Sequence, residues 1–411
     1  MQRVKLVKKI LIVSQAMEIG GAEKALLGLL EAIDKKIFQV DLFLLRHTGE
    51  LLKYIPDNIT ILPEKKEYAM LGIPLKETLR EKEYNIFWGR LKGNLRANKY
   101  VRKNYFKDAA AVNDEYSHKY TVNCMPMISD EEYDLAISFL APHYFVSKKV
   151  IAKEKMAWIH TDYETVEIDV DSELGMWSEY DYIASISDKV TESYRSFLKT
   201  FPSLHNKIIL FENIMPVEYI RNLSDSENVI EEMPQDESMI LLSIGRFCTA
   251  KNFDNVPDIC SKILNAGIKI KWYLIGYGPD EELIRNRIKE LQMEDYVCIL
   301  GKKENPYPYI KCCDIYIQPS RYEGKCVSVI EAQMLHKPVI ITDYATAGSQ
   351  LEDGVDGVVV PMNNTDCARK IVAVLRDKEL QRQLVENTKK RDYANIEEVN
   401  KIYRLLEIRE K

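Results

Sequence analysis

The sequence has no uninterrupted apolar run of 18 residues, the length that a membrane-spanning helix needs. A signal-peptide pattern is also missing, because Lys5, Lys8 and Lys9 interrupt the apolar residues near the N-terminus. There is no excess of positive charge: 57 Lys and Arg against 63 Asp and Glu give a net charge of −6. A chain with this balance is not expected to bind nucleic acid as a whole. We expect a cytoplasmic protein, with the inner face of the cell membrane as an alternative location.

Several sequence motifs are absent as well. The eight cysteines form no C-x-x-C pair and no zinc-like spacing, which predicts reduced thiols in a cytosolic protein. The dinucleotide motif G-x-G-x-x-G and the phosphate loop G-x-x-x-x-G-K-[ST] are missing. So are G-x-S-x-G, H-E-x-x-H and the protein-kinase motifs. The chain therefore lacks the motifs that hydrolases and kinases use for catalysis.

Short apolar segments alternate with segments of helical period in both halves of the chain. Such alternation predicts parallel sheets, and its occurrence twice in 411 residues predicts two α/β domains. We expect strands at 9–14, 39–45, 60–62, 135–139, 156–159, 183–186 and 208–211, and then at 239–244, 271–275, 297–300, 315–317, 339–342 and 358–360. Helices are expected at 22–33, 188–198, 256–265, 280–291 and 366–385.

A polar, acidic and turn-rich segment at 222–238 is the predicted linker. It separates a first domain at 1–221 from a second at 239–390, with a final helix at 391–411. Paired α/β domains bind ligands at the carboxyl ends of their strands. We therefore expect a site in the cleft between the two sheets.

Glu323 and Glu331 are the most informative residues. Their Glu-x7-Glu spacing follows an apolar strand-like run and leads into a helical segment. A strand, a turn and a helix place backbone N–H groups and a partial positive charge at one sheet edge, which suits phosphate. Carboxylates are poor phosphate ligands but good acceptors for sugar hydroxyls. A ligand with both groups is a nucleotide sugar.

Arg246 and Lys251 follow the first expected strand of the second half. A rigid guanidinium fork with a lysine ammonium suits a diphosphate and the negative charge that develops as it departs. The alternative is an unremarkable pair of surface cations. Their position at the carboxyl end of a strand favours the functional interpretation.

Two features of the first half could also contact a ligand. Gly20-Gly21 follows the first strand, where paired glycines allow a close backbone approach. His160 ends a strand-like run and could contact a sugar hydroxyl. A helix-starting turn and a structural histidine are the respective alternatives.

Two other motifs are interpreted as structural. In Gly276-Tyr277-Gly278-Pro279, the acidic residues that follow complement a helix start and would repel phosphate. Asp169-Val170-Asp171 matches the Asp-x-Asp pattern of metal-dependent glycosyltransferases, but it follows a polar stretch, so we expect a solvated acidic loop.

Residues 88–120 reverse the charge of the chain locally with a basic, aromatic composition. One interpretation is a solvated helical face. The other is a surface for anionic lipid or for a diphosphate-linked acceptor. The basic residues are Arg90, Lys92, Arg96, Lys99, Arg102, Lys103 and Lys107.

The order and spacing of these segments resemble the retaining glycosyltransferases of family 4, of the bacterial surface-polysaccharide type. That family has the GT-B architecture, in which two Rossmann-like parallel-sheet domains face a central cleft. The resemblance covers nearly the whole chain and is strongest from 244 to 361. It rests on Gly20-Gly21, Trp158-Ile159-His160, Gly245-Arg246 with Lys251-Asn252, Gly276-Tyr277-Gly278, Leu300-Gly301, Pro319-Ser320, Glu323-Gly324 through Glu331-Ala332, Pro338-Val339, and Asp353-Gly354 with Gly357.

The resemblance implies a hexosyltransferase that acts with retention and needs neither a metal nor a cofactor. Its donor would be a nucleotide-diphosphate sugar, with a UDP-sugar favoured over a GDP-sugar, and its acceptor a lipid-linked or surface glycan. The first domain would bind the acceptor and the second the nucleotide sugar, and the final helix would cross back to the first domain. By resemblance, Arg246 and Lys251 hold the diphosphate, Glu331 the ribose, Gly21 the distal phosphate, and His160 the sugar. Glu323 and the backbone of Gly324, Lys325, Cys326 and Val327 would hold the transferred sugar and its phosphate.

The run Lys325-Cys326 departs from the family, where an aromatic residue or leucine and then glycine or proline are commoner. A cation at the sugar end of the site could change the donor preference, so the sequence does not identify the donor sugar. Two alternatives remain: a nucleotide-sugar epimerase of GT-B build and a non-catalytic nucleotide-sugar-binding protein.

Overall fold

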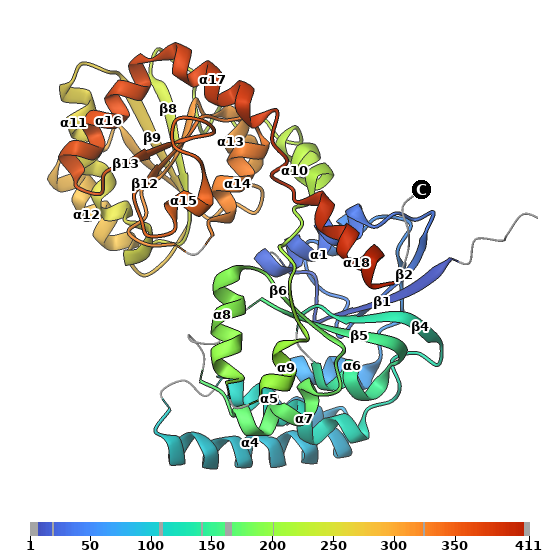
Figure 1. The fold of residues 1–411 in the computed structure, drawn as a ribbon. Helices are drawn as coiled ribbons and strands as arrows, with labels where there is room; N and C mark the ends of the chain where they lie inside the picture. Colours follow the sequence, from blue (N-terminus) through green and yellow to red (C-terminus); the bar gives the residue numbers. More distant parts are fainter. Residues whose placement is uncertain are drawn as a thin grey trace, which may run out of the picture. The chain divides into compact units, whose positions relative to one another are not determined.

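The computed structural model describes residues 7–18, 20–106, 110–140, 143–160, 167–199, 201–323 and 325–406. They form two compact units, each built around one sheet (Figure 1). Unit 1 contains the chain up to Pro216 and the segment from Asn395, and unit 2 contains Val217–Ala394. Among the described residues, no helix combines the length and the apolar character needed to cross a membrane.

Unit 1 has a seven-stranded sheet in the order β3-β2-β1-β4-β5-β6-β7, with parallel pairing throughout. Its strands are β1 Lys8–Ser14, β2 Phe38–Leu44, β3 Thr60–Ile61, β4 Glu132–Ser138, β5 Ile151–Ile159, β6 Tyr182–Ser185 and β7 Ile208–Leu210. Its helices are α1 Gly21–Ala32, α2 Lys66–Ala69, α3 Leu75–Arg80, α4 Tyr84–Asn104, α5 Ala110–Thr121, α6 His143–Lys149, α7 Val170–Trp177, α8 Asp188–Phe197, α9 Pro202–His205 and α18 Asn400–Leu405, with short 3₁₀ turns at Leu52–Tyr54, Met70–Gly72, Val122–Cys124 and Ile396–Val399.

Unit 2 has a six-stranded parallel sheet in the order β10-β9-β8-β11-β12-β13. Its strands are β8 Met239–Ile244, β9 Ile270–Ile275, β10 Val297–Gly301, β11 Ile315–Gln318, β12 Val339–Thr342 and β13 Val358–Val360. Its helices are α10 Val217–Ser224, α11 Val256–Asn265, α12 Glu281–Glu290, α13 Tyr307–Cys312, α14 Val327–Met334, α15 Ala347–Gln350, α16 Asn364–Arg376 and α17 Lys378–Thr388, with 3₁₀ turns at Thr249–Lys251 and Phe253–Asn255.

Both sheets owe their stability to strands that are apolar on both faces, as expected when helices cover a parallel sheet on each side. Ile10 to Val13 of β1 are fully buried, and so are Ile340 and Ile341 of β12. Each predicted strand has a counterpart in the structure within a few residues of the predicted bounds. The two strand orders have the doubly wound pattern of Rossmann-like folds.

One predicted helix is wrong: residues 366–385 do not form a single helix. Two helices, α16 and α17, occupy this region and meet at Asp377, whose ψ of 84° is not helical. The Asp377 side chain accepts a hydrogen bond from the backbone N–H of Leu380 and so caps α17. The apolar residues keep a helical period through both helices. The break depends on the single capping residue Asp377, so the period did not reveal it.

The boundaries between the units differ from the predicted linker at 222–238. Unit 2 begins at Val217, because the α10 helix packs against α13 of the same unit. At the other end, the segment from Asn395 belongs to unit 1. There Tyr403 stacks on Phe38 with 5.2 Å between ring centroids, and Lys401 donates a hydrogen bond to the Leu210 carbonyl.

Candidate functional site

The candidate donor site lies in unit 2, at the carboxyl ends of the adjacent strands β8 and β11. The strand order reverses between these two strands, and ligands of doubly wound sheets bind where this happens. Arg246 lies two residues beyond the end of β8, and Glu323 lies in the loop after β11. The fold therefore brings two predicted residues to one edge, although they are far apart in sequence.

Backbone contacts fix the loop that carries Arg246. Phe247 N–H donates to the Tyr277 carbonyl, and Gly245 N–H donates to the Ile275 carbonyl. A Cβ at Gly276 would lie 1.9 Å from the Gly245 carbonyl oxygen, so only glycine allows this approach. The Gly276 loop thus has the structural role predicted for it.

The Arg246 side chain itself is exposed. Within the described part of the chain it has no hydrogen bond or ion pair. A fixed backbone with an uncommitted guanidinium at a strand end is an arrangement that can accept an anionic ligand with little reorganisation.

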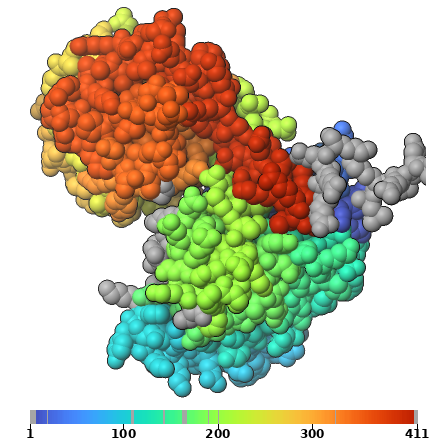
Figure 2. All heavy atoms as spheres, in the orientation of Figure 1, coloured from blue at the N-terminus to red at the C-terminus, as the bar shows by residue number. Residues whose placement is uncertain are grey.

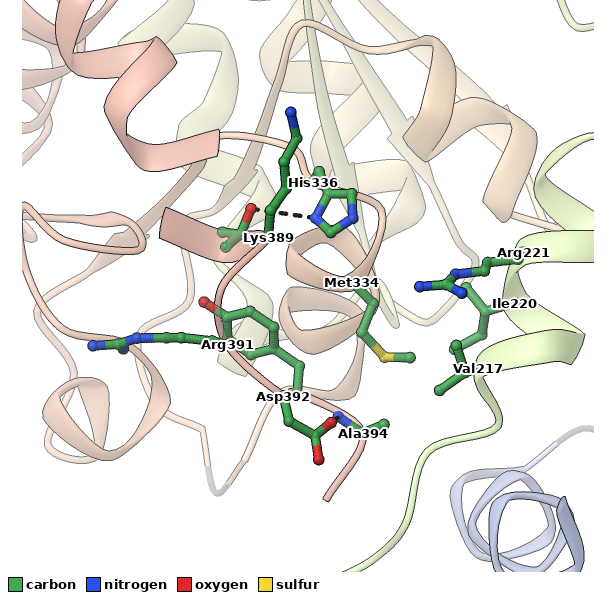
Figure 3. A pocket seen from close by; sticks show the side chains of 11 residues that line it. Val217, Ile220, Arg221, Met334, His336, Lys389, Arg391, Asp392 and Ala394 are labelled. Atoms are coloured by element: carbon green, nitrogen blue, oxygen red, sulfur yellow. Dashed lines mark hydrogen bonds between the residues drawn. The ribbon is translucent and has the colours of Figure 1, made fainter. Parts of the chain in front are cut away.

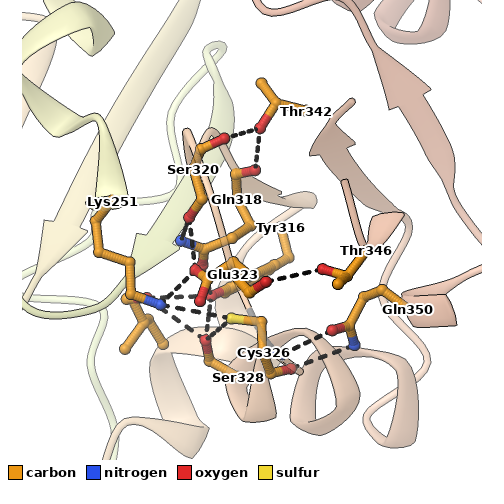
Figure 4. A network of polar contacts seen from close by, with 11 residues as sticks. Lys251, Tyr316, Gln318, Ser320, Glu323, Cys326, Ser328, Thr342, Thr346 and Gln350 are labelled. Atoms are coloured by element: carbon orange, nitrogen blue, oxygen red, sulfur yellow. Dashed lines mark hydrogen bonds and ion pairs between the residues drawn. The ribbon is translucent and has the colours of Figure 1, made fainter. Parts of the chain in front are cut away.

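Lys251 and Glu323 form an ion pair with each other, with 2.6 Å between Lys251 Nζ and Glu323 Oε1 (Figure 4). Their side chains are only 18% and 12% exposed, so solvent screens this pair weakly. Burial acts to lower the pKa of Lys251, but Cys326 and Glu323 outweigh it and the pKa is raised. Lys251 therefore carries a positive charge at neutral pH.

Side chains around this pair hold both loops in place. Asn252 adopts the left-handed conformation at φ 61°, and its side-chain amide donates to the Pro319 carbonyl at 2.8 Å. Arg321 donates two hydrogen bonds to the Asp254 carboxylate. Ser320 Oγ donates to Glu323 Oε1 at 2.6 Å (Figure 4). The carboxylate of Glu323 is thus held from two sides before any ligand binds.

The predicted backbone ligands at the start of α14 are placed differently from one another. Cys326 is buried, and its N–H donates to Gln350 Oε1 at 2.7 Å, so this group is already engaged. Val327 is the first residue of α14, where helix N–H groups lack partners within the helix. Lys325 is exposed, and Gly324 lies outside the described residues.

Glu331 lies one helical turn further along α14 and is buried. Tyr307 OH donates to Glu331 Oε1 at 2.8 Å. Burial raises the pKa of Tyr307, so its hydroxyl keeps the proton that it donates. The carboxylate predicted to bind ribose is therefore held by a tyrosine of α13.

The remaining predicted residues, Gly21 and His160, belong to unit 1. Gly21 begins α1, is exposed, and has open space where a Cβ would stand. His160 follows β5, and burial lowers the pKa of its imidazole to about 4. Both of its ring nitrogens are buried, and the Phe139 backbone acts in the opposite direction, to raise the pKa.

The Asp-x-Asp string has a structural role. Asp169 is the N-cap of α7 and accepts from Ser172 N–H at 3.1 Å and from Tyr116 OH at 2.6 Å. An N-cap carboxylate satisfies helix N–H groups. The predicted solvated loop is wrong for Asp169, which is buried. Across the described ranges, no group of three or more His, Cys, Asp or Glu side chains is arranged to hold a metal.

A cavity of unit 2, of about 140 Å³, is lined by residues that include His336 and Arg391 (Figure 3). Two of its cations are committed: Arg391 is paired with Asp356 and Glu352, and Lys389 with Glu386. The cavity is therefore a weaker candidate for a phosphate than the β8–β11 edge.

Sequence reasoning missed the residues that hold the predicted ones in place, namely Ser320, Tyr307 and Gln350. Ser320 precedes Glu323 by three residues, but nothing in this spacing showed that the two side chains are in contact. Tyr307 and Gln350 are 24 residues away from their partners in opposite directions. No local pattern could have found them.

Comparison with known proteins finds similarity to glycosyltransferases. Residues 225–391, which lie within unit 2, match the family model of "Glycosyl transferases group 1". An N-acetyl-alpha-D-glucosaminyl L-malate synthase of Bacillus anthracis is 24% identical over 360 residues, which are 82% of this chain and 91% of that protein. Alpha-D-kanosaminyltransferase of Streptomyces kanamyceticus is 25% identical over 155 residues, which are 37% of this chain and only 40% of that enzyme.

Solved structures show the same fold over the whole chain. Anabaena Alr3699/HepE in complex with UDP has a TM-score of 0.60 at 14% identity, over 97% of this chain and 99% of that chain. With the two strand orders above, this likeness confirms the predicted fold class for both Rossmann-like sheets: the chain has the GT-B fold.

Proposed function

We propose that this protein is a glycosyltransferase that moves a sugar from a nucleotide-diphosphate sugar to a hydroxyl group of a glycan or lipid-linked acceptor. The observation that carries the proposal is the exposed, uncommitted Arg246 beside the Lys251–Glu323 pair at the β8–β11 edge. The group 1 match to residues 225–391 supports it, as do relatives named for sugar transfer. A UDP-sugar is the favoured donor, and the neighbour solved with UDP supports that choice.

The proposed chemistry uses the charges at this edge. As the bond between the anomeric carbon and the diphosphate oxygen breaks, Arg246 and Lys251 stabilise the negative charge on the leaving group. The acceptor hydroxyl attacks the anomeric carbon from the same face and passes its proton to the departing phosphate, which gives retention. Glu323 accepts hydrogen bonds from sugar hydroxyls, and Glu331 from the ribose. The two cations do what a divalent ion does in other transferases, so no metal is required.

A panel of nucleotides and nucleotide sugars tests the proposal. UDP at about 100 times its Kd stabilises a folded protein by about 2.7 kcal/mol, so we expect the melting temperature of unit 2, which would bind it, to rise by about 5–10 °C. EDTA should leave both this shift and sugar transfer unchanged. The proposal is wrong if no nucleotide stabilises the protein, or if donor incubated without acceptor is converted to an epimer. NMR of the product glycoside reports whether the anomeric configuration is retained.

We also propose that unit 1 contacts anionic membrane through α4. The inner side of α4 is committed to the fold: Arg90 donates to the carbonyls of Met70 and Ile73. On the outer side, Trp88 and Leu95 are each 63% exposed. Exposed cations surround them, namely Lys92, Arg96, Lys99, Arg102 and Lys103, while Lys107 lies outside the described residues. Figure 2 shows this helix, in blue to cyan, at the surface of unit 1.

Exposed apolar side chains flanked by cations are typical of helices that lie on anionic membranes, where each cation contributes about 1 kcal/mol. We expect the wild type to float with vesicles of phosphatidylcholine and phosphatidylglycerol. Changing Arg96, Lys99, Arg102 and Lys103 to glutamate should abolish flotation. The matched control reverses four exposed cations of unit 2, Lys269, Arg285, Lys289 and Arg382. Unaltered flotation of the α4 variant, or equal loss in the control, contradicts the membrane assignment.

A further inference from the structure

The two cations of the candidate donor site differ in one respect: Arg246 is open, whereas Lys251 is occupied. The Arg246 guanidinium is exposed and makes no hydrogen bond or ion pair among the described residues. Lys251 Nζ lies 2.6 Å from Glu323 Oε1, in a pair whose side chains are only 18% and 12% exposed. One cation proposed to hold a diphosphate is therefore already bound by a carboxylate of the same site.

The aliphatic part of Lys251 is fixed against the end of β8. A Cβ placed on Gly245 would lie 3.0, 3.1 and 3.3 Å from Lys251 Cε, Cδ and Cγ, so the lysine side chain runs close over this glycine. The backbone N–H of Lys251 donates to the Cys248 carbonyl at 2.9 Å. A change of partner by Lys251 therefore involves mainly its ammonium end.

The ammonium has capacity for a further partner. Figure 4 shows it pointing to Glu323 and Cys326, and its distance to Cys326 Sγ is 3.7 Å. An ammonium has three N–H donors, and sulfur is a weak acceptor. Glu323 is therefore the strong partner of Lys251, and a phosphate oxygen would be a competitor of similar strength.

Glu323 is held independently of Lys251. Ser320 Oγ donates to the same carboxylate oxygen at 2.6 Å, and Thr346 Oγ1 donates to the Glu323 backbone carbonyl at 2.9 Å (Figure 4). When the ammonium turns to another anion, these contacts keep the carboxylate in place. Glu323 then needs a new donor, because a largely buried carboxylate without a cation or enough hydrogen-bond donors is costly.

A nucleotide sugar and a free nucleoside diphosphate meet this requirement differently. Both offer a diphosphate that competes with Glu323 for Lys251. The sugar of the intact donor also brings hydroxyl groups that can donate to Glu323 in place of the ammonium. A nucleoside diphosphate without a sugar has no such replacement, so its capture of Lys251 leaves Glu323 under-satisfied.

We infer that Glu323 regulates the phosphate site by withholding Lys251 from a free nucleoside diphosphate and yielding it to a nucleotide sugar. The inference rests on the proposed function and deepens it. After the sugar has left, the Lys251–Glu323 pair forms again and displaces the diphosphate from one of its two cations. The site thereby discriminates against its own product.

UDP binding by the full chain, measured by isothermal titration calorimetry, tests this inference. Glu323→Gln removes the charge that holds Lys251, so UDP should bind about tenfold more tightly than to the wild type. Glu323→Asp keeps the charge but withdraws it from Lys251 by one methylene, so it should tighten UDP binding about threefold. The second variant also serves if Glu323→Gln does not fold.

Lys251→Ala separates this exchange of partners from simple repulsion between Glu323 and the diphosphate. In a chain that already carries Lys251→Ala, adding Glu323→Gln should change UDP affinity by less than about twofold. Asp258→Asn is the matched control, because it removes a partly buried carboxylate from the Asp258–Lys262 ion pair in α11 of the same unit. It should leave UDP affinity unchanged.

Three results would overturn the inference alone. They are a Glu323→Gln variant, or the aspartate variant in its place, that binds UDP no more tightly than the wild type, an equal gain in Asp258→Asn, and a gain that persists in Lys251→Ala. A wild type that binds no UDP at all would instead contradict the proposed function, and this inference with it.

Discussion

Arg246→Ala lowers the kcat of sugar transfer by about two to three orders of magnitude, with a smaller rise in KM for the donor. In the proposed mechanism the guanidinium faces the charge that develops on the leaving diphosphate, and loss of one such donor typically costs about 2.7–4 kcal/mol of transition-state stabilisation. Lys251→Ala should behave similarly. Arg246→Lys retains the charge but loses the bidentate geometry of the guanidinium. Its kcat should therefore fall between those of the wild type and Arg246→Ala. Steady-state kinetics with a UDP-sugar measures all three.

Arg285→Ala is the control for this result. Arg285 is an exposed arginine of the same unit, and its ion pair with Glu281, four residues earlier in α12, stabilises the helix by only a few tenths of a kcal/mol. Its kinetics should match the wild type. If Arg246→Ala and Lys251→Ala both keep wild-type kcat, the assignment of the two cations to the diphosphate must be abandoned.

Gly276→Ala lowers the free energy of unfolding by about 3 kcal/mol or more and also weakens binding of UDP. The added Cβ would lie 1.9 Å from the Gly245 carbonyl oxygen, and the φ of +152° is one that alanine rarely adopts. Relief of this contact requires movement of the backbone that carries Arg246, so stability and nucleotide affinity fall together. Chemical denaturation and UDP titration measure the two effects.

Gly267→Ala separates backbone strain from collision. Gly267 also has a positive φ, +82°, but has open space where the Cβ would stand. We expect a loss of about 1–2 kcal/mol with unchanged UDP affinity. Equal effects of the two substitutions would contradict the role given to the Gly276 loop.

The sequence predicted the sheets well because fully buried parallel strands are continuous apolar runs, as in Ile10 to Val13 of β1. It also placed Arg246 and Glu323 at strand ends, and the parallel arrangement then brings those ends to one edge. The helical period of apolar residues predicted helix boundaries less well where a single side chain caps a helix, as Asp377 caps α17.

The sequence could not predict contacts between residues that are distant along the chain. The pairing of Lys251 with Glu323 spans 72 residues, and the hydrogen bond of Cys326 N–H to Gln350 spans 24. Neither follows from propensity or spacing, because each depends on how two loops pack after the sheet has formed.

The return of the chain to unit 1 at Asn395 has a consequence for biosynthesis. Unit 2, residues 217–394, is contiguous and can form its sheet as soon as it leaves the ribosome. Unit 1 is complete only after the segment from Asn395 has been translated. Until Tyr403 arrives, Phe38 lacks its stacking partner, and the nascent chain presents an incomplete apolar surface to chaperones. A chain that terminates between Ala394 and Tyr403 would therefore have a damaged unit 1, although most of that unit is translated first.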